Sequence, residues 1–194
     1  MKLIATVLLL CGLAFGQAPS GNNAQSNNNA QLAIRPQTSD ASEQKTVKEV
    51  RHELIMLPYY SLFDDLEFSV NGSTVTLLGS VVNPVLKKDA ENVVKRVEGV
   101  TQVNNQIKVL PPSSIDDQIR RQTARAIQSQ GSLYRYFMGA VPSIHIIVDN
   151  GHVTLKGVVD NQADETQARL AANRVPDVFS VTSDLVVANQ VAKK

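Results

Sequence analysis

The chain has 194 residues, a formal net charge of +1 at pH 7 and no tryptophan. This length suits one or two small domains, and the near-neutral charge excludes a general electrostatic attraction to nucleic acid. Aromatic residues make up only 5% of the chain, which also disfavours a surface on which bases stack. We therefore expect no nucleic-acid partner, while a hydrophobic content of 43% predicts folded cores.

Residues 1–16 have the composition of a secretory signal peptide. Lys2 is followed by an almost entirely apolar run, and Ala14 and Gly16 supply small residues at the positions that a signal peptidase reads. The run is too short to span a membrane comfortably. We predict cleavage after Gly16 and an exported mature chain, with an uncleaved anchor as the alternative.

The only cysteine, Cys11, lies inside this apolar run. A lipoprotein would need a small residue directly before its lipidated cysteine, and Leu10 stands there instead. The mature chain would have no cysteine, so no disulfide is expected, although an exported compartment would allow one. Residues 17–41 are rich in Asn, Gln and Ser and carry too little apolar surface to offset the entropy of ordering, so they are predicted to be a disordered leader.

One stretch of sequence occurs twice. The segment VTLLGSVVN at residues 75–83 returns as VTLKGVVDN at residues 153–161. The offset, 153 − 75 = 78, holds without a gap to Val109 and Val187. Residues are identical at positions 75, 76, 77, 79, 81, 83, 90, 96, 97, 100, 103 and 109 of the first copy. A fixed offset over this length indicates a duplicated folding unit.

The first unit, residues 42–110, is predicted to form a helix, two strands, a helix and a strand. Apolar residues at three- and four-residue steps indicate a first helix that Ser42 caps and Pro58 ends. Alternating apolar residues then predict two strands, at residues 66–70 and 75–81.

The second half of this unit begins with Asn83 and Pro84. Asn caps free amides, and Pro fits the first helical position. Gly99 is suited to the left-handed conformation that ends a helix. A third strand is expected over residues 103–109, with Asn105 interrupting its apolar face.

The second unit, residues 115–189, repeats this order after a linker at residues 111–114, and residues 190–194 form a tail. Ser114 is predicted to cap its first helix, whose apolar face begins with Ile115.

Several Asn and Gly residues mark turns and helix starts in the second unit. Asn150 and Gly151 give the strongest hairpin signal in the chain, since both central residues of such a turn take positive φ. Asn161 is predicted to cap the last long helix. Gly79 and Gly157 lie inside strands, which indicates a bulge or a close contact with a helix, with ligand contact as the alternative.

Together these elements predict an α+β fold with two tandem αββαβ units. Each unit is expected to be a three-stranded mixed sheet with two helices packed on one face. Neighbouring strands joined by a tight turn pair antiparallel. The strand–helix–strand crossover is long enough to make the outer strands parallel, and the crossover itself should be right-handed.

Three segments of the chain resemble the BON (bacterial OsmY and nodulation) domain family. They are NGSTVTLLGSV at residues 71–81, VEGVTQVNN at residues 97–105 and, in the second copy, NGHVTLKG at residues 150–157. The second copy departs from the pattern at Asp177, which stands at the position of Gly99. The resemblance covers nearly the whole mature chain.

This resemblance implies a tandem pair of BON domains in a protein of the periplasm or outer membrane, linked to osmotic or envelope stress. It also implies binding to phospholipid surfaces or other envelope components, without established catalytic residues. We therefore expect no enzymatic activity and no cofactor. The alternative is a protein-binding or chaperone-like module that uses a sheet edge or the cleft between the domains.

The best candidate for a lipid-binding surface lies in the second unit. Basic side chains on its first helix are predicted to lie largely off the apolar face, and aromatic residues follow in the next link. Basic residues beside aromatic rings suit a membrane interface with anionic headgroups. The alternative is that the aromatic side chains cover the core while the arginines are solvated. The candidate residues are Arg120, Arg121, Arg125, Tyr134, Arg135 and Tyr136.

Other polar clusters carry weaker functional signals. His145, Asp149 and His152 should share one face of the second hairpin, but no fourth ligand is evident, and we predict no metal site. No catalytic-triad order, phosphate loop or zinc spacing is present. Two acidic pairs occur at a loop and at a helix start, where carboxylates have structural uses; these are Asp64-Asp65 and Asp116-Asp117.

Overall fold

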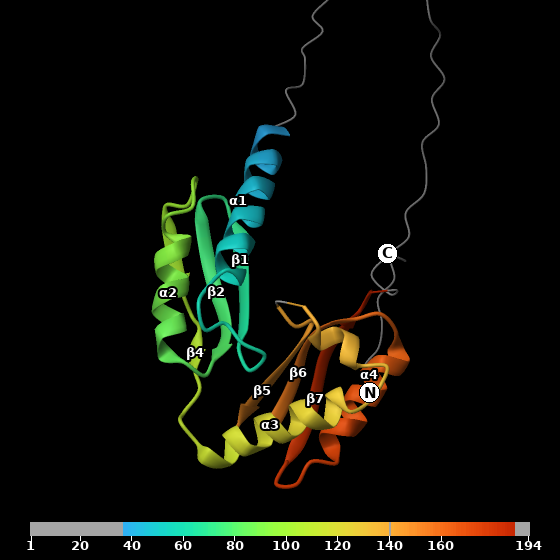
Figure 1. Ribbon diagram of the computed structural model, residues 1–194. Coiled ribbons are helices and arrows are strands. Elements are labelled where there is room, and N and C mark those ends of the chain that lie inside the picture. Colours follow the sequence, from blue (N-terminus) through green and yellow to red (C-terminus); the bar gives the residue numbers. More distant parts are fainter. Residues whose placement is uncertain (1–36, 140, 189–194) are drawn as a thin grey trace, which may run out of the picture. The chain divides into compact units, whose positions relative to one another are not determined.

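The chain forms two copies of one arrangement of helices and strands (Figure 1). The computed structural model describes residues 37–139 and 141–188. The signal peptide predicted at residues 1–16, most of the predicted leader and the tail at residues 190–194 lie outside the described residues. Both copies have the predicted α+β composition, and both sheets mix parallel and antiparallel pairs.

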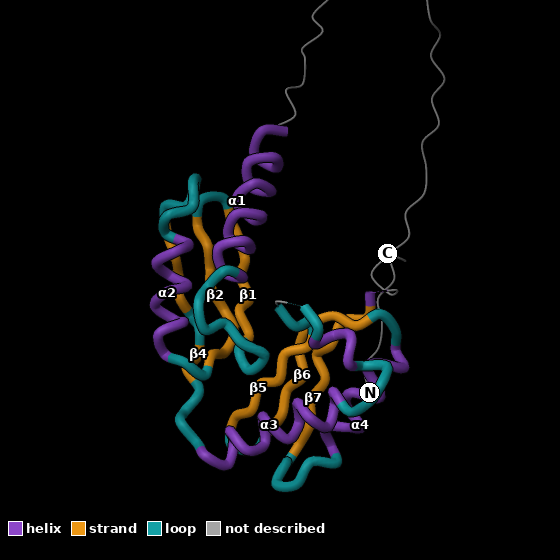
Figure 2. The backbone as a smooth tube through the Cα atoms, viewed as in Figure 1, coloured by secondary structure: helices purple, strands orange, loops and turns teal. Residues whose placement is uncertain are grey.

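The first repeat contains two helices and a mixed sheet. Its elements are α1 (Gln37–Ile55), β1 (Asp65–Asn71), β2 (Thr74–Val81), α2 (Pro84–Val94), β3 (Gln102–Asn105) and β4 (Lys108–Val109). Strand β2 lies in the centre, antiparallel to β1 and parallel to β3 and β4 (Figure 2). Helix α1 begins within the segment expected to be leader, so Ser42 is an internal helical residue and the prediction that it caps the helix is wrong.

The third strand of this repeat is divided where one strand was expected. The side-chain amide of Asn105 donates to the carbonyl of Lys87 in α2 at 2.8 Å, and its oxygen accepts from the amide of Ile107 at 3.2 Å. These bonds turn the backbone between β3 and β4. Ile107 is thereby buried, with 1% of its surface exposed.

The second repeat has the same order with one additional turn of helix. Its elements are α3 (Ser114–Gln128), the 3₁₀ helix η1 (Tyr134–Phe137), β5 (Ile144–Asp149), β6 (His152–Val159), α4 (Gln162–Asn173) and β7 (Ser180–Val187). Ser113 caps α3 by accepting from the amide of Asp116, so the predicted cap at Ser114 is displaced by one residue. Asn161 caps α4, and Asn83 caps α2, as predicted.

The register of the strands confirms the duplicated unit. Val75 of β2 faces Val103 of β3, and Val153 of β6 faces Val181 of β7. Both residues of the second pair follow those of the first by the same offset, 153 − 75 = 181 − 103 = 78. The duplication therefore extends to individual pairs across the sheet.

Two glycines at equivalent positions permit close backbone contact. Gly79 has φ +105° and Gly157 has φ +121°, conformations that L-residues with a Cβ rarely adopt. A Cβ at Gly79 would lie 2.2 Å from the carbonyl oxygen of Asp65, and one at Gly157 would lie 2.0 Å from that of Ser143. The close neighbour at both glycines is therefore the backbone at the start of the outer strand, and the helix contact expected there is wrong.

Each repeat has its own hydrophobic core, where the apolar sides of its sheet and helices meet. The two outer strands differ in burial. Strand β5 is buried at five consecutive positions, whereas β1 is only partly buried along most of its length. Leu62 and Phe63, which precede β1, pack against the core of the second repeat. The first repeat thus contributes apolar side chains to the second.

Candidate functional site

Helix α3 presents only part of the predicted basic surface to solvent. Arg120 is 2% exposed, because its guanidinium extends toward β5. It donates to the carbonyl of Val148 at 2.7 Å and pairs with Asp117 at 2.5 Å. The prediction that Arg120 lies off the apolar face is therefore wrong, while Arg121 and Arg125 are exposed.

Arg135 and Tyr136 belong to a polar network at the start of α4. The buried hydroxyl of Tyr136 donates to Asp164 at 2.7 Å and accepts from the amide of Asp160 at 2.9 Å. Arg135 pairs with both carboxylates and lies over the ring of Tyr136. Burial raises the pKa of Tyr136, and the hydrogen bond to Tyr136 raises that of Arg135. These two side chains hold the link after α3 against the repeat.

The exposed part of this surface combines two arginines with apolar side chains. Ile115, which was expected in the apolar face of α3, is 62% exposed. It lines a shallow pocket together with Phe179, which is 79% exposed. Tyr134 is also exposed and follows α3 in η1. The sequence pattern did not single out Phe179, because its exposure depends on the loop that precedes β7.

His152 of the second hairpin does not pair with the carboxylate that lies opposite it. His152 lies opposite Asp149, as expected from the turn at Asn150 and Gly151. However, its Nδ1 contacts the hydroxyl of Ser180 at 2.7 Å, while Asp149 pairs with Lys108. Among residues 37–139 and 141–188, no group of three or more His, Cys, Asp or Glu side chains is placed to hold a metal ion.

The acidic pairs contain buried acceptors for backbone amides. Asp116 is 2% exposed and accepts from the amides of Gly151 at 2.8 Å and Asn150 at 3.0 Å. Asp64, also 2% exposed, accepts from the amide of Val82 at 2.8 Å. Both carboxylates therefore have structural partners that account for their position.

Charged and aromatic side chains from both repeats meet beside β5 and β6. Lys156 lies 2.9 Å from Asp65 and 2.7 Å from Glu67, although its contact with Asp65 lacks the geometry of a hydrogen bond. Burial raises the pKa of Asp65, and Lys156 partly opposes this effect. The ring of Tyr60 stacks on that of His145, with centroids 5.4 Å apart. Burial also raises the pKa of Tyr60.

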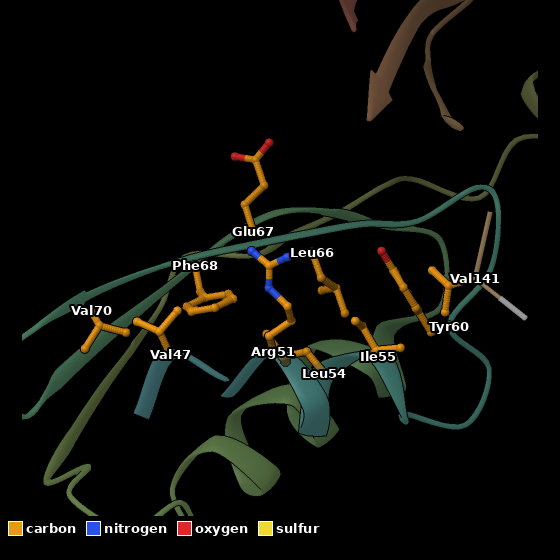
Figure 3. Close-up of a pocket in the computed structure, with 10 residues that line it drawn as sticks. All are labelled: Val47, Arg51, Leu54, Ile55, Tyr60, Leu66, Glu67, Phe68, Val70 and Val141. Atoms are coloured by element: carbon orange, nitrogen blue, oxygen red, sulfur yellow. The ribbon is translucent and has the colours of Figure 1, made fainter. Parts of the chain in front are cut away.

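A groove of about 590 Å³ runs between α1 and β1. Figure 3 shows Leu66 and Phe68 of β1 directed toward α1, and the side chain of Arg51 rising from α1 toward β1. Tyr60 and Val141 lie at one end of the groove. The remaining lining residues are Val47, Leu54, Ile55, Glu67 and Val70. Sequence patterns missed this groove, because the apolar positions of α1 and β1 were expected to be covered by each other.

Comparisons with known proteins agree with this architecture. Residues 42–111 and 115–189 each match the BON domain. Over 196 residues the chain is 30% identical to Osmotically-inducible protein Y of Escherichia coli strain K12, an alignment that covers 95% of this chain and 94% of that protein. No helix in the described part of the chain is long and apolar enough to cross a membrane.

Two solved structures of CdsD, a structural protein of the type III secretion system of Chlamydia trachomatis, are also similar to parts of the chain. They are 12% and 13% identical, with TM-scores of 0.26 and 0.28. The matches cover 73% and 77% of this chain, and 96% of each of those chains. Similarity at this level carries no argument about function.

Proposed function

Because the chain belongs to the BON domain family, we propose that it is an exported, non-enzymatic envelope protein that acts under osmotic stress and binds anionic phospholipid through its second repeat. The similarity to Osmotically-inducible protein Y along nearly the full length of both chains supports the link to osmotic stress and a periplasmic location. The exposed side chains of α3 support the proposal that this surface binds lipid.

The observation that carries this proposal is the chemistry of the exposed side chains on α3 and beside its first turn. Ile115, Arg121 and Arg125 are all exposed on this helix, and Phe179 is exposed beside its first turn. No carboxylate of the described residues forms an ion pair with Arg121 or Arg125. Apolar side chains that enter the headgroup region beside basic side chains are typical of peripheral membrane contacts.

The expected affinity is modest and sensitive to salt. Each basic side chain near an anionic surface contributes about 1 kcal/mol, an attraction that salt screens. Two arginines remain available, since Arg120 is buried and Arg135 is paired with carboxylates. In the first repeat, the corresponding helix carries Glu49 and Glu53 on either side of Arg51, so we expect weaker lipid binding there.

Liposome co-sedimentation tests the proposal. The full mature chain should pellet with vesicles that contain phosphatidylglycerol and stay in solution with pure phosphatidylcholine. The double variant Arg121→Glu/Arg125→Glu should lose at least about tenfold in binding, because two attractive charges become repulsive. The matched control Lys88→Glu/Arg96→Glu makes the same charge change on exposed positions of the first repeat and should bind normally.

A second variant separates apolar insertion from charge. Ile115→Ser/Phe179→Ser should weaken binding without changing its dependence on salt. Equal binding to both kinds of vesicle, no binding to either, or equal losses in the two double charge variants would contradict the proposal.

A further inference from the structure

We propose that the groove between α1 and β1 binds an extended polypeptide segment of a partner protein. The segment would add to the outer edge of β1 and direct apolar side chains toward α1. This site is in the first repeat, so the inference does not depend on lipid binding by the second.

The outer edge of β1 has backbone groups available for pairing. Among the described strands, β1 pairs only with β2. The carbonyl of Leu77 in β2 accepts from the amide of Gln106, so Leu77 directs its polar backbone groups away from β1. Phe68 lies opposite Leu77, and Val70 lies two residues further along. In an antiparallel pair this places the amide and carbonyl groups of Phe68 and Val70 on the outer edge.

The second repeat shows how the same edge is completed. Ile146 and Val148 correspond to Phe68 and Val70 by the repeat offset, since 146 − 68 = 148 − 70 = 78. The amide of Ile146 donates to the carbonyl of Leu62 at 2.9 Å, while the carbonyl of Val148 accepts from Arg120 at 2.7 Å. One backbone carbonyl from the turn that precedes β1 and an arginine side chain therefore bond to this edge of β5.

The first repeat lacks the arginine that fills this space. Three buried residues of α1 correspond to three buried residues of α3 that follow 73 positions later, since 119 − 46 = 73. The pairs are Thr46 and Ile119, Val50 and Thr123, and Leu54 and Ile127. Because 120 − 47 = 73, Val47 stands where the second repeat has Arg120. The side chain of Val47 has no hydrogen-bond donor, so it cannot bond to β1 as Arg120 bonds to β5, and it lines the groove.

The chemistry of the groove favours a polypeptide over a lipid acyl chain. Apolar side chains cover most of its walls, but its β1 side also carries the outward backbone groups of Phe68 and Val70. An acyl chain would bury these groups without hydrogen bonds, whereas an added strand pairs with them. Arg51 rises from α1 toward β1, and its guanidinium supplies a donor for a carbonyl of the segment (Figure 3).

A peptide from the chain itself provides a defined probe. The segment PYYSLFDD, residues 58–65, contains Leu62, whose carbonyl bonds to the equivalent edge of the second repeat from within a turn. We would titrate this peptide, blocked at both ends, into the ¹⁵N-labelled mature chain. The amide signals of Phe68 and Val70 should shift saturably and their hydrogen exchange should slow. The amide of Ile146 should change little, because its partner is held on the same chain at high effective concentration.

Two groove variants and one control test the location. Val47→Arg introduces the residue type that fills this space in the second repeat, and should weaken peptide binding about tenfold. Val70→Pro removes one outward amide, a change that an edge strand tolerates, and should weaken binding similarly. Val85→Arg, an exposed position on α2, should leave binding unchanged. Circular dichroism shows which variants retain the fold.

The outcomes separate the possible occupants of the groove. The probe carrying L62D and F63D should not bind. Absence of saturable shifts at Phe68 and Val70 up to millimolar peptide would overturn the proposal. Displacement of the peptide by decanoate, with no slowing of hydrogen exchange at Phe68 and Val70 when decanoate is bound, would also overturn the proposal. That result would indicate a site for acyl chains. Protection that appears without peptide at high protein concentration, together with a doubled mass, would instead assign the groove to a second copy of the chain.

Discussion

Gly157 illustrates how one residue decides whether a strand fits against its neighbour. Its φ of +121° and the position of the Ser143 carbonyl leave no room for a Cβ, and Gly79 repeats the arrangement beside Asp65. The amide of Val158 then donates to the carbonyl of Ser143 at 3.0 Å. The glycine is therefore required by the backbone path at the start of the hairpin, and ligand contact is not needed to explain it.

Replacing Gly157 by alanine should lower the free energy of unfolding by about 3 kcal/mol, because strain at φ and a backbone clash act together. Urea denaturation of Gly157→Ala measures this loss. Gly131→Ala is the matched control, since no atom lies within 4 Å of its added Cβ, and it should change stability by less than about 0.5 kcal/mol. Similar stability of the two variants would contradict the assigned role.

The helices begin at side chains that accept from free amides. Asn83 accepts from the amide of Val85 at 3.0 Å, and Asn161 accepts from that of Asp164 at 2.9 Å. The side-chain amide of Asn161 also donates to the Asp164 carboxylate, which binds Tyr136. The cap of α4 is thus connected to the buried polar network, whereas the cap of α2 is more exposed.

Removing the two caps should therefore have unequal effects. Asn83→Ala should cost about 1 kcal/mol of stability, and Asn161→Ala should cost more, about 2 kcal/mol, because Asp164 also loses a donor. Asn83→Ser and Asn161→Ser keep the capping oxygen and should recover most of the loss at Asn83 but only part at Asn161. Equal losses of stability for Asn83→Ala and Asn161→Ala in thermal and urea unfolding would contradict a link between the cap of α4 and the buried polar network.

At the scale of the whole molecule, ionic contacts link the two repeats, which belong to one compact unit. Lys156 of β6 contacts Asp65 and Glu67 of β1. Burial alone would lower the pKa of Lys156, but the ion pair with Asp65 and the charged hydrogen bond to Glu67 outweigh it and raise the pKa. The pKa of Asp65 is raised above its ordinary value of 3.8 chiefly by burial. The native state therefore binds the Asp65 proton more tightly than the unfolded state does.

These shifts predict how stability depends on pH. Because the pKa of Asp65 is higher in the folded state, the free energy of unfolding falls as pH rises through the range between its unfolded and folded pKa values, and then levels off. Lys156→Met removes the cation that opposes this shift. The variant should therefore lose more stability at about pH 7.5 than at about pH 3.5, where Asp65 is largely protonated.

Urea denaturation at the two pH values measures this difference. Lys88→Met, at an exposed position on α2, should show no such pH-dependent loss. The double variant Asp65→Asn/Lys156→Met should show much less of it than Lys156→Met alone. An equal cost of Lys156→Met at both pH values would contradict the assignment of Asp65 as its titrating partner.

The amino-acid sequence by itself determined the duplicated αββαβ order, because hydrophobic periodicity, the hairpin at Asn150 and Gly151, and the caps Asn83 and Asn161 are local properties that recur at a fixed offset. It also identified the family. Prediction from the sequence failed where a side chain bonds to an element that is distant in the chain. Arg120 has the sequence position of a surface residue, yet the carbonyl of Val148 and the carboxylate of Asp117 make its burial favourable.

Tertiary structure alone decided which surfaces remain open. The strands β1 and β5 have similar alternation, but Leu62, Phe63 and Arg120 cover only β5. In the groove beside β1, Val47 stands where the second repeat has Arg120, and the segment that precedes β1 packs on the other repeat. Such differences arise from pairing between residues far apart in the chain, and no local pattern of apolar and polar residues encodes that pairing.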